Sequence, residues 1–193
     1  MEKKYTILIA AAIVAFAAGV SGLIVSSNSS SGNQGGVTGL SETKGPWQPE
    51  YTGLTTRIRE LRIPAPGTEK YHVHARLAIY AEGQKLPVPT NIGLTSGALS
   101  ALHTHDDTGL MHIEADAPFE VKLSDFFTIW GVKFTDTQVG GYKNDETKTL
   151  QVFVNGKKVD SPANYVVQAK DTIIVGHGTP DSFPTNDTSP FPE

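Results

Sequence analysis

Residues 71–81 read YHVHARLAIYA, and their alternation of side chains predicts a β-strand with two unlike faces. Side chains two residues apart along a strand point to the same side of a sheet. One face therefore carries five apolar side chains, those of Val73, Ala75, Leu77, Ile79 and Ala81. The other face carries His72, His74 and Arg76. Because the apolar stripe is the side that buries, both histidines are expected to point away from the core.

Further β patterns follow this strand. The expected strands span residues 85–92, 99–105, 110–115, 119–122, 149–155, 165–168 and 172–175. Asn155-Gly156 predicts a type I′ hairpin, and DDTG at 106–109 predicts a tight reversal. The expected fold class is mostly β, of the α+β type: an antiparallel β-sandwich or partly open barrel with one or two short helices. Residues 119–178 also have the element order of a β-grasp unit, a likeness of fold alone.

Two short helices are expected beside the strands. Leu54, Ile58 and Leu61 are spaced as on one face of a helix, which the IPAPG of residues 63–67 would end. A second helix is expected over residues 125–130, with Ser124 as its N-cap and Gly131 as its stop.

The N-terminal segment predicts a membrane anchor. Residues 5–25 carry no charge, and as a helix they would be about 31 Å long, enough to span a bilayer. A cleaved signal peptide is the alternative, although its apolar stretch is usually shorter and ends at small residues. Lys3 and Lys4 favour a cytoplasmic N-terminus, which places the rest of the chain outside the cell.

The chain therefore divides into four expected parts. Residues 1–25 form the anchor, 26–46 a flexible Ser/Gly linker, 47–180 a β-rich metal-binding domain and 181–193 a disordered tail. A formal net charge of −4 without any basic block excludes a nucleic-acid surface. The expected partners are a metal ion and, through residues 5–25, the lipid bilayer, with a homo-oligomer or a membrane complex left open.

Histidine clustering is the main functional signal. Five of the six histidines form close sets: His72 with His74, His103 with His105, and His112 two residues before Glu114. If residues 106–109 close a loop of two or four residues, His103 pairs opposite His112, and His105 opposite Leu110. The imidazoles and the Glu114 carboxylate would then share one face. Leu102, Met111 and Ile113 would turn to the core.

These residue types point to a transition metal. Neutral imidazole suits Zn, Cu, Ni and Fe, and the chain has no cysteine to supply a thiolate. Cu(II) and Zn(II) are the expected ions, and the candidate ligands are His72, His74, His103, His105 and His112, with Glu114 and His177 as further candidates. His177 either joins the site or lies in a loop. Asp106 and Asp107 either orient imidazoles or serve only the turn.

The order of motifs resembles a set of uncharacterised anchored or secreted domains of archaea and bacteria. The shared segments are RIREL, HVHARLAIYAEG, LPVPTNIGL, LHTHDDTGLMHIE and LSDFFTIWGV, between residues 54 and 178. The resemblance implies that HVH, HTHD and GLMHIE act as one unit, and it implies no activity. A looser similarity to the H-x-H motifs of multicopper oxidases lacks their cysteine, and Glu114 lies too far along the chain for the cupin pattern.

Three functions are compatible with the sequence. The first is a membrane-anchored, extracytoplasmic protein that binds copper or zinc through the histidine cluster. The second is a mononuclear metal-dependent oxidoreductase or hydrolase with one coordination position open. The third is a surface module without metal, in which protonation of clustered histidines near pH 6 tunes an interface. No substrate pocket can be located from the sequence.

Overall fold

The computed structural model describes residues 37–68 and 70–191. The predicted anchor at 5–25 and the first part of the linker, 26–36, lie outside this part of the chain. Within the described residues, no helix combines the length and the apolar character that crossing a membrane requires.

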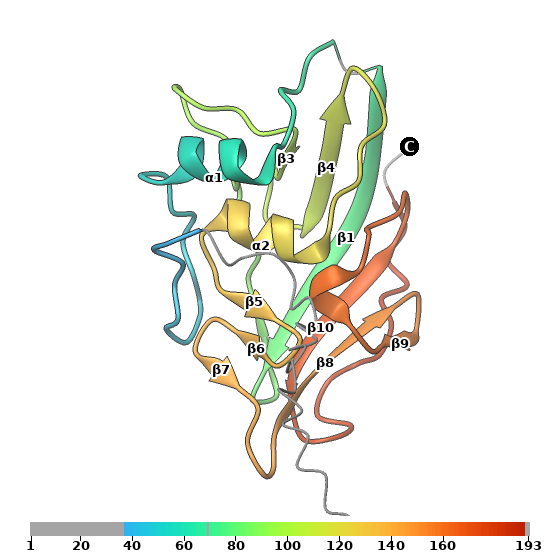
Figure 1. The fold of residues 1–193 in the computed structure, drawn as a ribbon. Helices are drawn as coiled ribbons and strands as arrows, with labels where there is room; N and C mark the ends of the chain where they lie inside the picture. Colours follow the sequence, from blue (N-terminus) through green and yellow to red (C-terminus); the bar gives the residue numbers. More distant parts are fainter. Residues whose placement is uncertain (1–36, 69, 192–193) are drawn as a thin grey trace, which may run out of the picture.

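The main element is a mixed sheet. Its strands lie in the order β3 (Leu102–His103), β4 (Leu110–Ala115), β1 (Tyr71–Ala81), β10 (Thr172–Gly178), β8 (Thr149–Val154) and β9 (Lys157–Val159) (Figure 1). β2 (Gln84–Leu86) pairs with β1, beyond β4 on the same edge. The short strands β5 (Phe134–Thr135), β6 (Gln138–Val139) and β7 (Tyr142–Lys143) form a second, smaller sheet. The described chain is thus mostly β with two short α-helices, as expected.

The expected all-antiparallel arrangement is wrong at the centre of the sheet. β1 and β10 run parallel, in register from Arg76 opposite Thr172 to Ala81 opposite His177. Neither sheet closes into a barrel. Parallel neighbours need a long crossover, and here the chain between β1 and β10 includes helix α2 (Leu123–Trp130). Residues 119–178 therefore do not form a separate unit, because their last strand, β10, pairs with β1 from outside this range.

Several expected strands are shorter or absent. β2 ends at Leu86 because Pro87 has no N–H to give to a ladder. The strand expected over 99–105 is reduced to two residues, and residues 119–122 and 165–168 share only one isolated bridge, between Lys122 and Val166. The small sheet at residues 134–143 was not predicted, because its strands have two residues each and such short segments show no alternation pattern.

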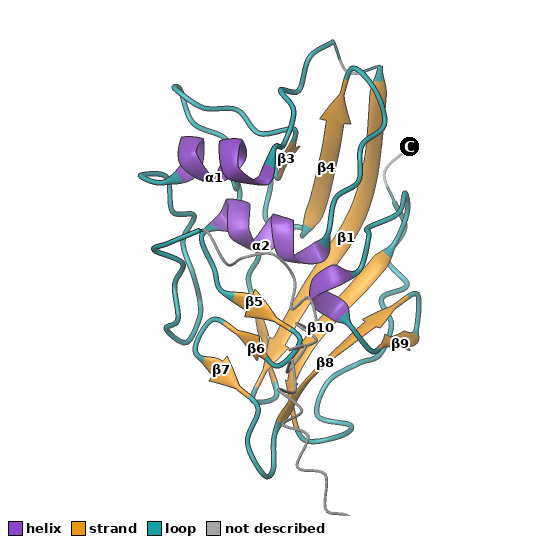
Figure 2. Ribbon diagram, viewed as in Figure 1, coloured by secondary structure: helices purple, strands orange, loops and turns teal. Residues whose placement is uncertain are grey.

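Both helices lie over one face of the main sheet (Figure 2). α1 (Leu54–Leu61) contacts α2, and α2 contributes Phe126, Phe127 and Trp130 to the core, each fully buried. α2 begins two residues earlier than expected: Lys122 is its N-cap, and the Asp125 carboxylate accepts the Lys122 N–H at 2.8 Å. Ser124 lies inside the helix. Gly131, at φ +92, ends it as expected.

The apolar stripe of β1 meets these helices. Leu77 and Ile79 of β1, with Met111 and Ile113 of β4, are 0–2% exposed and belong to the same core. This confirms which face of residues 71–81 buries, and β1 therefore turns its even-numbered residues to the back of the sheet.

The C-terminal tail, expected to be disordered, lies against that back surface as far as it is described. The Phe183 ring occupies the space where a side chain at Gly176 would stand. Arg76 donates to the Pro190 carbonyl at 2.7 Å and stacks over the Phe191 ring at 5.0 Å. The polar, proline-rich composition of the tail does not predict these contacts, because they depend on residues of β1 and β10 that the fold brings next to it.

Candidate metal centre

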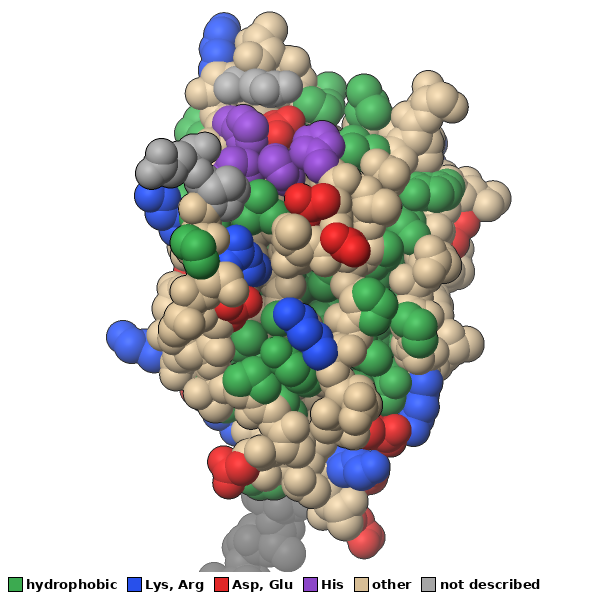
Figure 3. Space-filling view, turned by 180° about the vertical axis from the view of Figure 1, so that it is seen from behind, with side chains coloured by type: hydrophobic (Ala, Val, Ile, Leu, Met, Phe, Trp, Pro, Cys, Tyr) green, Lys and Arg blue, Asp and Glu red, His purple; other side chains and the backbone are tan. Residues whose placement is uncertain are grey.

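Three adjacent strands bring the candidate ligands together. β1 pairs with β4 so that His72 lies opposite Glu114 and His74 opposite His112. β3 pairs with β4 so that His103 lies opposite His112, which confirms the predicted register. Viewed from behind, the histidines form one group near the end of the face that the helices leave uncovered (Figure 3).

His105 reaches the group from outside a strand. The expected pairing of His105 with Leu110 does not form, because the β3–β4 ladder includes only Leu102 and His103 of β3. The chain at His105 is held by Thr90, whose hydroxyl donates to the His105 carbonyl at 2.6 Å. The His105 and His103 Nε2 atoms are 3.1 Å apart. His105 therefore joins the group although the pairing predicted for it does not form.

His112 Nδ1 is the point where the side chains converge. His72 Nε2 lies 3.3 Å from it, His74 Nε2 3.2 Å and Glu114 Oε1 3.0 Å. A ring nitrogen either donates its one proton or accepts with its one lone pair. One hydrogen bond can therefore account for only one of these three short contacts. A cation between the donors would satisfy all of them together.

Glu114 is a buried carboxylate whose ion-pair partners, among the described residues, are histidines and not lysines or arginines. The residue is 5% exposed, and its recorded ion-pair contacts are to His72 Nε2 at 2.9 Å, His112 Nδ1 at 3.0 Å and His103 Nε2 at 3.7 Å. Burying a carboxylate is costly unless a positive charge compensates it. Burial is the largest effect on the pKa of His112 and of His103, and it lowers both. At neutral pH these two imidazoles are therefore uncharged, and a metal ion could supply the positive charge that compensates the Glu114 carboxylate.

The ring of His103 is oriented from behind. Its Nδ1 lies 3.0 Å from the Ser100 carbonyl, which can only accept, so Nδ1 carries the proton. In the neutral ring, Nε2 then has the free lone pair, and this atom faces His105 and Glu114. Such an outer hydrogen bond is what ligating histidines usually make. Sequence reasoning did not find Ser100, because a backbone carbonyl leaves no signal in residue types.

Burial also lowers the pKa of His74, and the neighbouring His112 and His72 lower it further. A histidine with a lowered pKa keeps its lone pair at neutral pH. These donors are thus in the form that binds a metal without first losing a proton.

The donors fall into two overlapping groups. One group comprises His103, His105, His112 and Glu114, and the other His72, His74 and His112. Within each group, the candidate ligand atoms all lie within 4.8 Å of one another. The structure therefore gathers six of the seven candidate ligands.

His177 is the candidate that lies elsewhere. On β10 it pairs with Ala81, whose side chain belongs to the core-facing stripe of β1. Its Nε2 donates to the Lys143 carbonyl at 2.9 Å, and its ring lies beside Tyr142. The alternation could not assign a face to His177, because Ile173, Ile174 and Val175 are apolar on both sides of the strand.

Asp106 serves the turn. Its Oδ1 accepts the Thr108 N–H at 2.9 Å and the Thr108 hydroxyl at 2.5 Å, and these hydrogen bonds hold the pKa of Asp106 below its ordinary value. This supports the turn interpretation for Asp106.

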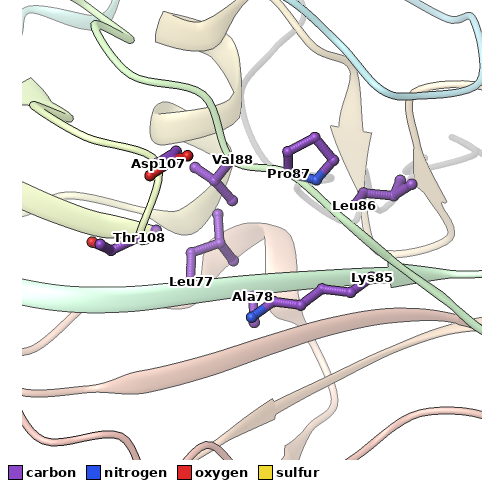
Figure 4. Close-up of a pocket in the computed structure, with 9 residues that line it drawn as sticks. Leu77, Ala78, Lys85, Leu86, Pro87, Val88, Asp107 and Thr108 are labelled. Carbon is purple, nitrogen blue, oxygen red and sulfur yellow. The ribbon is translucent and has the colours of Figure 1, made fainter.

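A pocket of about 240 Å³ adjoins this turn. Asp107 and Thr108 stand on one side, Lys85, Leu86 and Pro87 on the other, and Leu77 with Ala78 between them (Figure 4). The pocket lies where β1 exchanges β4 for β2 as its neighbour. None of the clustered histidines lines it.

Comparison of the chain with protein-family models, with curated proteins and with solved structures finds no match. The functional argument therefore depends on the geometry of the site.

Proposed function

We propose that this chain binds a transition-metal ion, Cu(II) or Zn(II), through the histidine cluster on the face of its sheet opposite the helices. The observation that carries the proposal is the convergence of His72 Nε2, His74 Nε2 and Glu114 Oε1 on His112 Nδ1 at 3.0–3.3 Å. Imidazole nitrogens with one carboxylate and no thiolate suit these borderline ions.

We also propose that the site is displayed outside the cell on a membrane anchor. The support is the uncharged run at residues 5–25 behind Lys3 and Lys4, with a polar linker after it. A surface protein of this kind would capture a metal ion or transfer it to a partner, which requires ligands and no substrate pocket.

A metal-dependent enzyme is the second candidate, and the adjoining pocket is the observation in its favour. Its lining combines the Lys85 side chain and Asp107 with apolar residues, as a small polar ligand would require. The pocket does not include a histidine of the cluster, so binding of the ion remains the first proposal.

Metal content tests the proposal directly. Full-length protein purified in detergent is loaded with Zn(II) or Cu(II), freed of loose metal and measured by elemental analysis. We expect at least one ion per chain, and a loss of affinity of about 100-fold or more in His112→Ala, because that variant removes the shared donor. His177→Gln is the matched control. It changes the one histidine outside the cluster and should retain the metal.

Two results would contradict the proposal: less than about 0.2 ion per chain in the wild type, or equal retention by His112→Ala and the wild type. His74→Ala is a second variant in case the first misfolds, because it removes one of the three contacts of His112 Nδ1 and leaves His112 in place. Circular dichroism on each variant shows whether the sheet is intact.

A further inference from the structure

We propose that the cluster holds two metal ions, one beside β1 and one beside β3, with the Glu114 carboxylate between them. This inference rests on the proposed metal-binding function and specifies its site.

The number of donors is the first reason. Five imidazoles and one carboxylate converge, whereas a zinc ion in a protein site usually takes four ligands. The two groups of donors have only His112 in common. Six ligands divided over two ions leave each with a normal number of protein donors. A single ion would leave some of these histidines without a role.

The β1 side already has the spacing of one coordination sphere. His72 Nε2 and His74 Nε2 lie 3.3 and 3.2 Å from His112 Nδ1. Two nitrogens bound to one tetrahedral zinc ion lie about 3.3 Å apart, given Zn–N bonds of about 2.0–2.1 Å. The three nitrogens could therefore bind one ion with little movement.

The β3 side forms a second pair of donors. His103 Nε2 and His105 Nε2 are 3.1 Å apart, close to the same spacing. The Ser100 carbonyl fixes the His103 ring with its free lone pair toward the cluster. His105, by contrast, is exposed, and the centre of its ring lies 4.5 Å from that of the His112 ring.

Glu114 lies between the two sides. Its Oε1 is 2.9 Å from His72 Nε2 and 3.0 Å from His112 Nδ1, whereas its Oε2 is the oxygen nearer His103 Nε2, at 3.7 Å. Each oxygen thus faces a different set of nitrogens. A carboxylate in this position can join two ions about 3.5–4 Å apart, the usual spacing in two-metal sites.

The surrounding charge is compatible with more than one cation. The turn after His105 carries Asp106 and Asp107. Asp106 follows the donor His105 directly in the chain, and its Oδ1 accepts hydrogen bonds from Thr108. Glu114 thus provides a negative charge among the nitrogens, and Asp106 provides another next to His105 in the chain.

Stoichiometry tests the inference. Full-length protein is titrated with Zn(II) and separately with Cu(II), and bound metal is counted by elemental analysis and native mass spectrometry. We expect two ions in the wild type and one in His105→Ala, which retains the β1-side donors. One ion is also expected in His74→Ala, which retains His103 and His105. Both positions are at least partly exposed, so each variant should fold.

Electron paramagnetic resonance of the Cu(II) form gives a second measure. Two copper ions about 4 Å apart interact magnetically, so the wild-type signal should be broadened and weaker per copper than that of either variant. His177→Gln, outside the cluster, should give the wild-type spectrum.

Failure of the inference differs from failure of the metal-binding function. One ion in the wild type, with affinity reduced by both His74→Ala and His105→Ala, would overturn the two-ion site while metal binding stands. Two ions with the coupled spectrum unchanged in both variants would overturn this assignment of ligands. Less than about 0.2 ion per chain would overturn both proposals.

Discussion

His103 and His112 face each other across β3 and β4, and their rings are fixed in different ways. His103 is held by the Ser100 carbonyl at its Nδ1, so its proton position follows from a single backbone contact. His112 Nδ1 has three short side-chain contacts, of which hydrogen bonding can satisfy one. The first residue is therefore positioned by the fold, whereas the second lies in a group of side chains that could hold a metal ion.

The proton position of His103 can be measured. In the metal-free protein near neutral pH, long-range ¹H–¹⁵N NMR should show the Nδ1–H form of His103, because the Ser100 carbonyl cannot donate. Zn(II) should shift its Nε2 resonance and leave the Nδ1–H in place. An Nε2–H form in the metal-free protein would contradict this orientation.

At the scale of the elements, the outer edge of β1 is shared by two partners. Residues 71–76 pair with β4, and residues 79–81 pair with β2. At the junction, the Leu77 N–H donates to the Gly109 carbonyl at 2.8 Å, and a Cβ on Gly109 would stand 2.1 Å from the Leu77 carbonyl oxygen. Gly109 thus allows the turn to approach β1 closely and lets β4 start in the register that aligns His112 with His74.

Two glycine substitutions distinguish the cost of a positive φ from the cost of a steric clash with the backbone. Gly83→Ala, at φ +79 with nothing within 4 Å of the new Cβ, should cost about 1 kcal/mol of unfolding free energy. Gly109→Ala, at φ +80, should cost about 3 kcal/mol or more because it also collides with backbone. Urea unfolding measures both. Metal affinity should fall in Gly109→Ala alone, and equal effects of the two variants would contradict the close approach.

At the scale of the whole molecule, the two faces of the main sheet have different tasks. The helices and the apolar stripe form the core on one face, and the histidines with the docked tail occupy the other. The candidate metal site thus lies outside the apolar core. Its effect on stability in the metal-free protein comes through protons, because three of its histidines have lowered pKa values.

The stability of the metal-free protein should depend on pH with a defined sign. Burial is the main cause of the lowered pKa of His74, His103 and His112, whereas in the unfolded chain they titrate near their ordinary value of 6.5. Below this value the unfolded chain binds more protons, so the free energy of unfolding should rise with pH up to about 6.5 and then level off. Urea midpoints at about pH 5.5 and 7.5 measure this difference.

A variant with His74, His103 and His112 all replaced by Gln is the control for that pH dependence. It lacks the three titrating groups, so its midpoints should differ much less between the two pH values. A wild-type midpoint that does not change with pH would count against the burial of these imidazoles. Saturating Zn(II) should widen the wild-type difference, because protons compete with the ion for the same nitrogens.

For β1, β3 and β4, the sequence alone determined which side faces the core and which side carries the histidines. The alternation in residues 71–81 separated the histidines from the apolar stripe, and the turn at 106–109 set His103 opposite His112. Both follow from local physics, since strand periodicity and turn length act within a few residues.

Only the tertiary structure decided which strands are neighbours. The parallel pairing of β1 with β10, the alignment of His72 and His74 with Glu114 and His112, and the separation of His177 all depend on residues far apart in the chain. Strand order is set by how the apolar faces share one core beneath the helices, and no local pattern encodes that choice. The same packing buried Glu114 among histidines, and this contact turned a row of imidazoles into a candidate site for two ions.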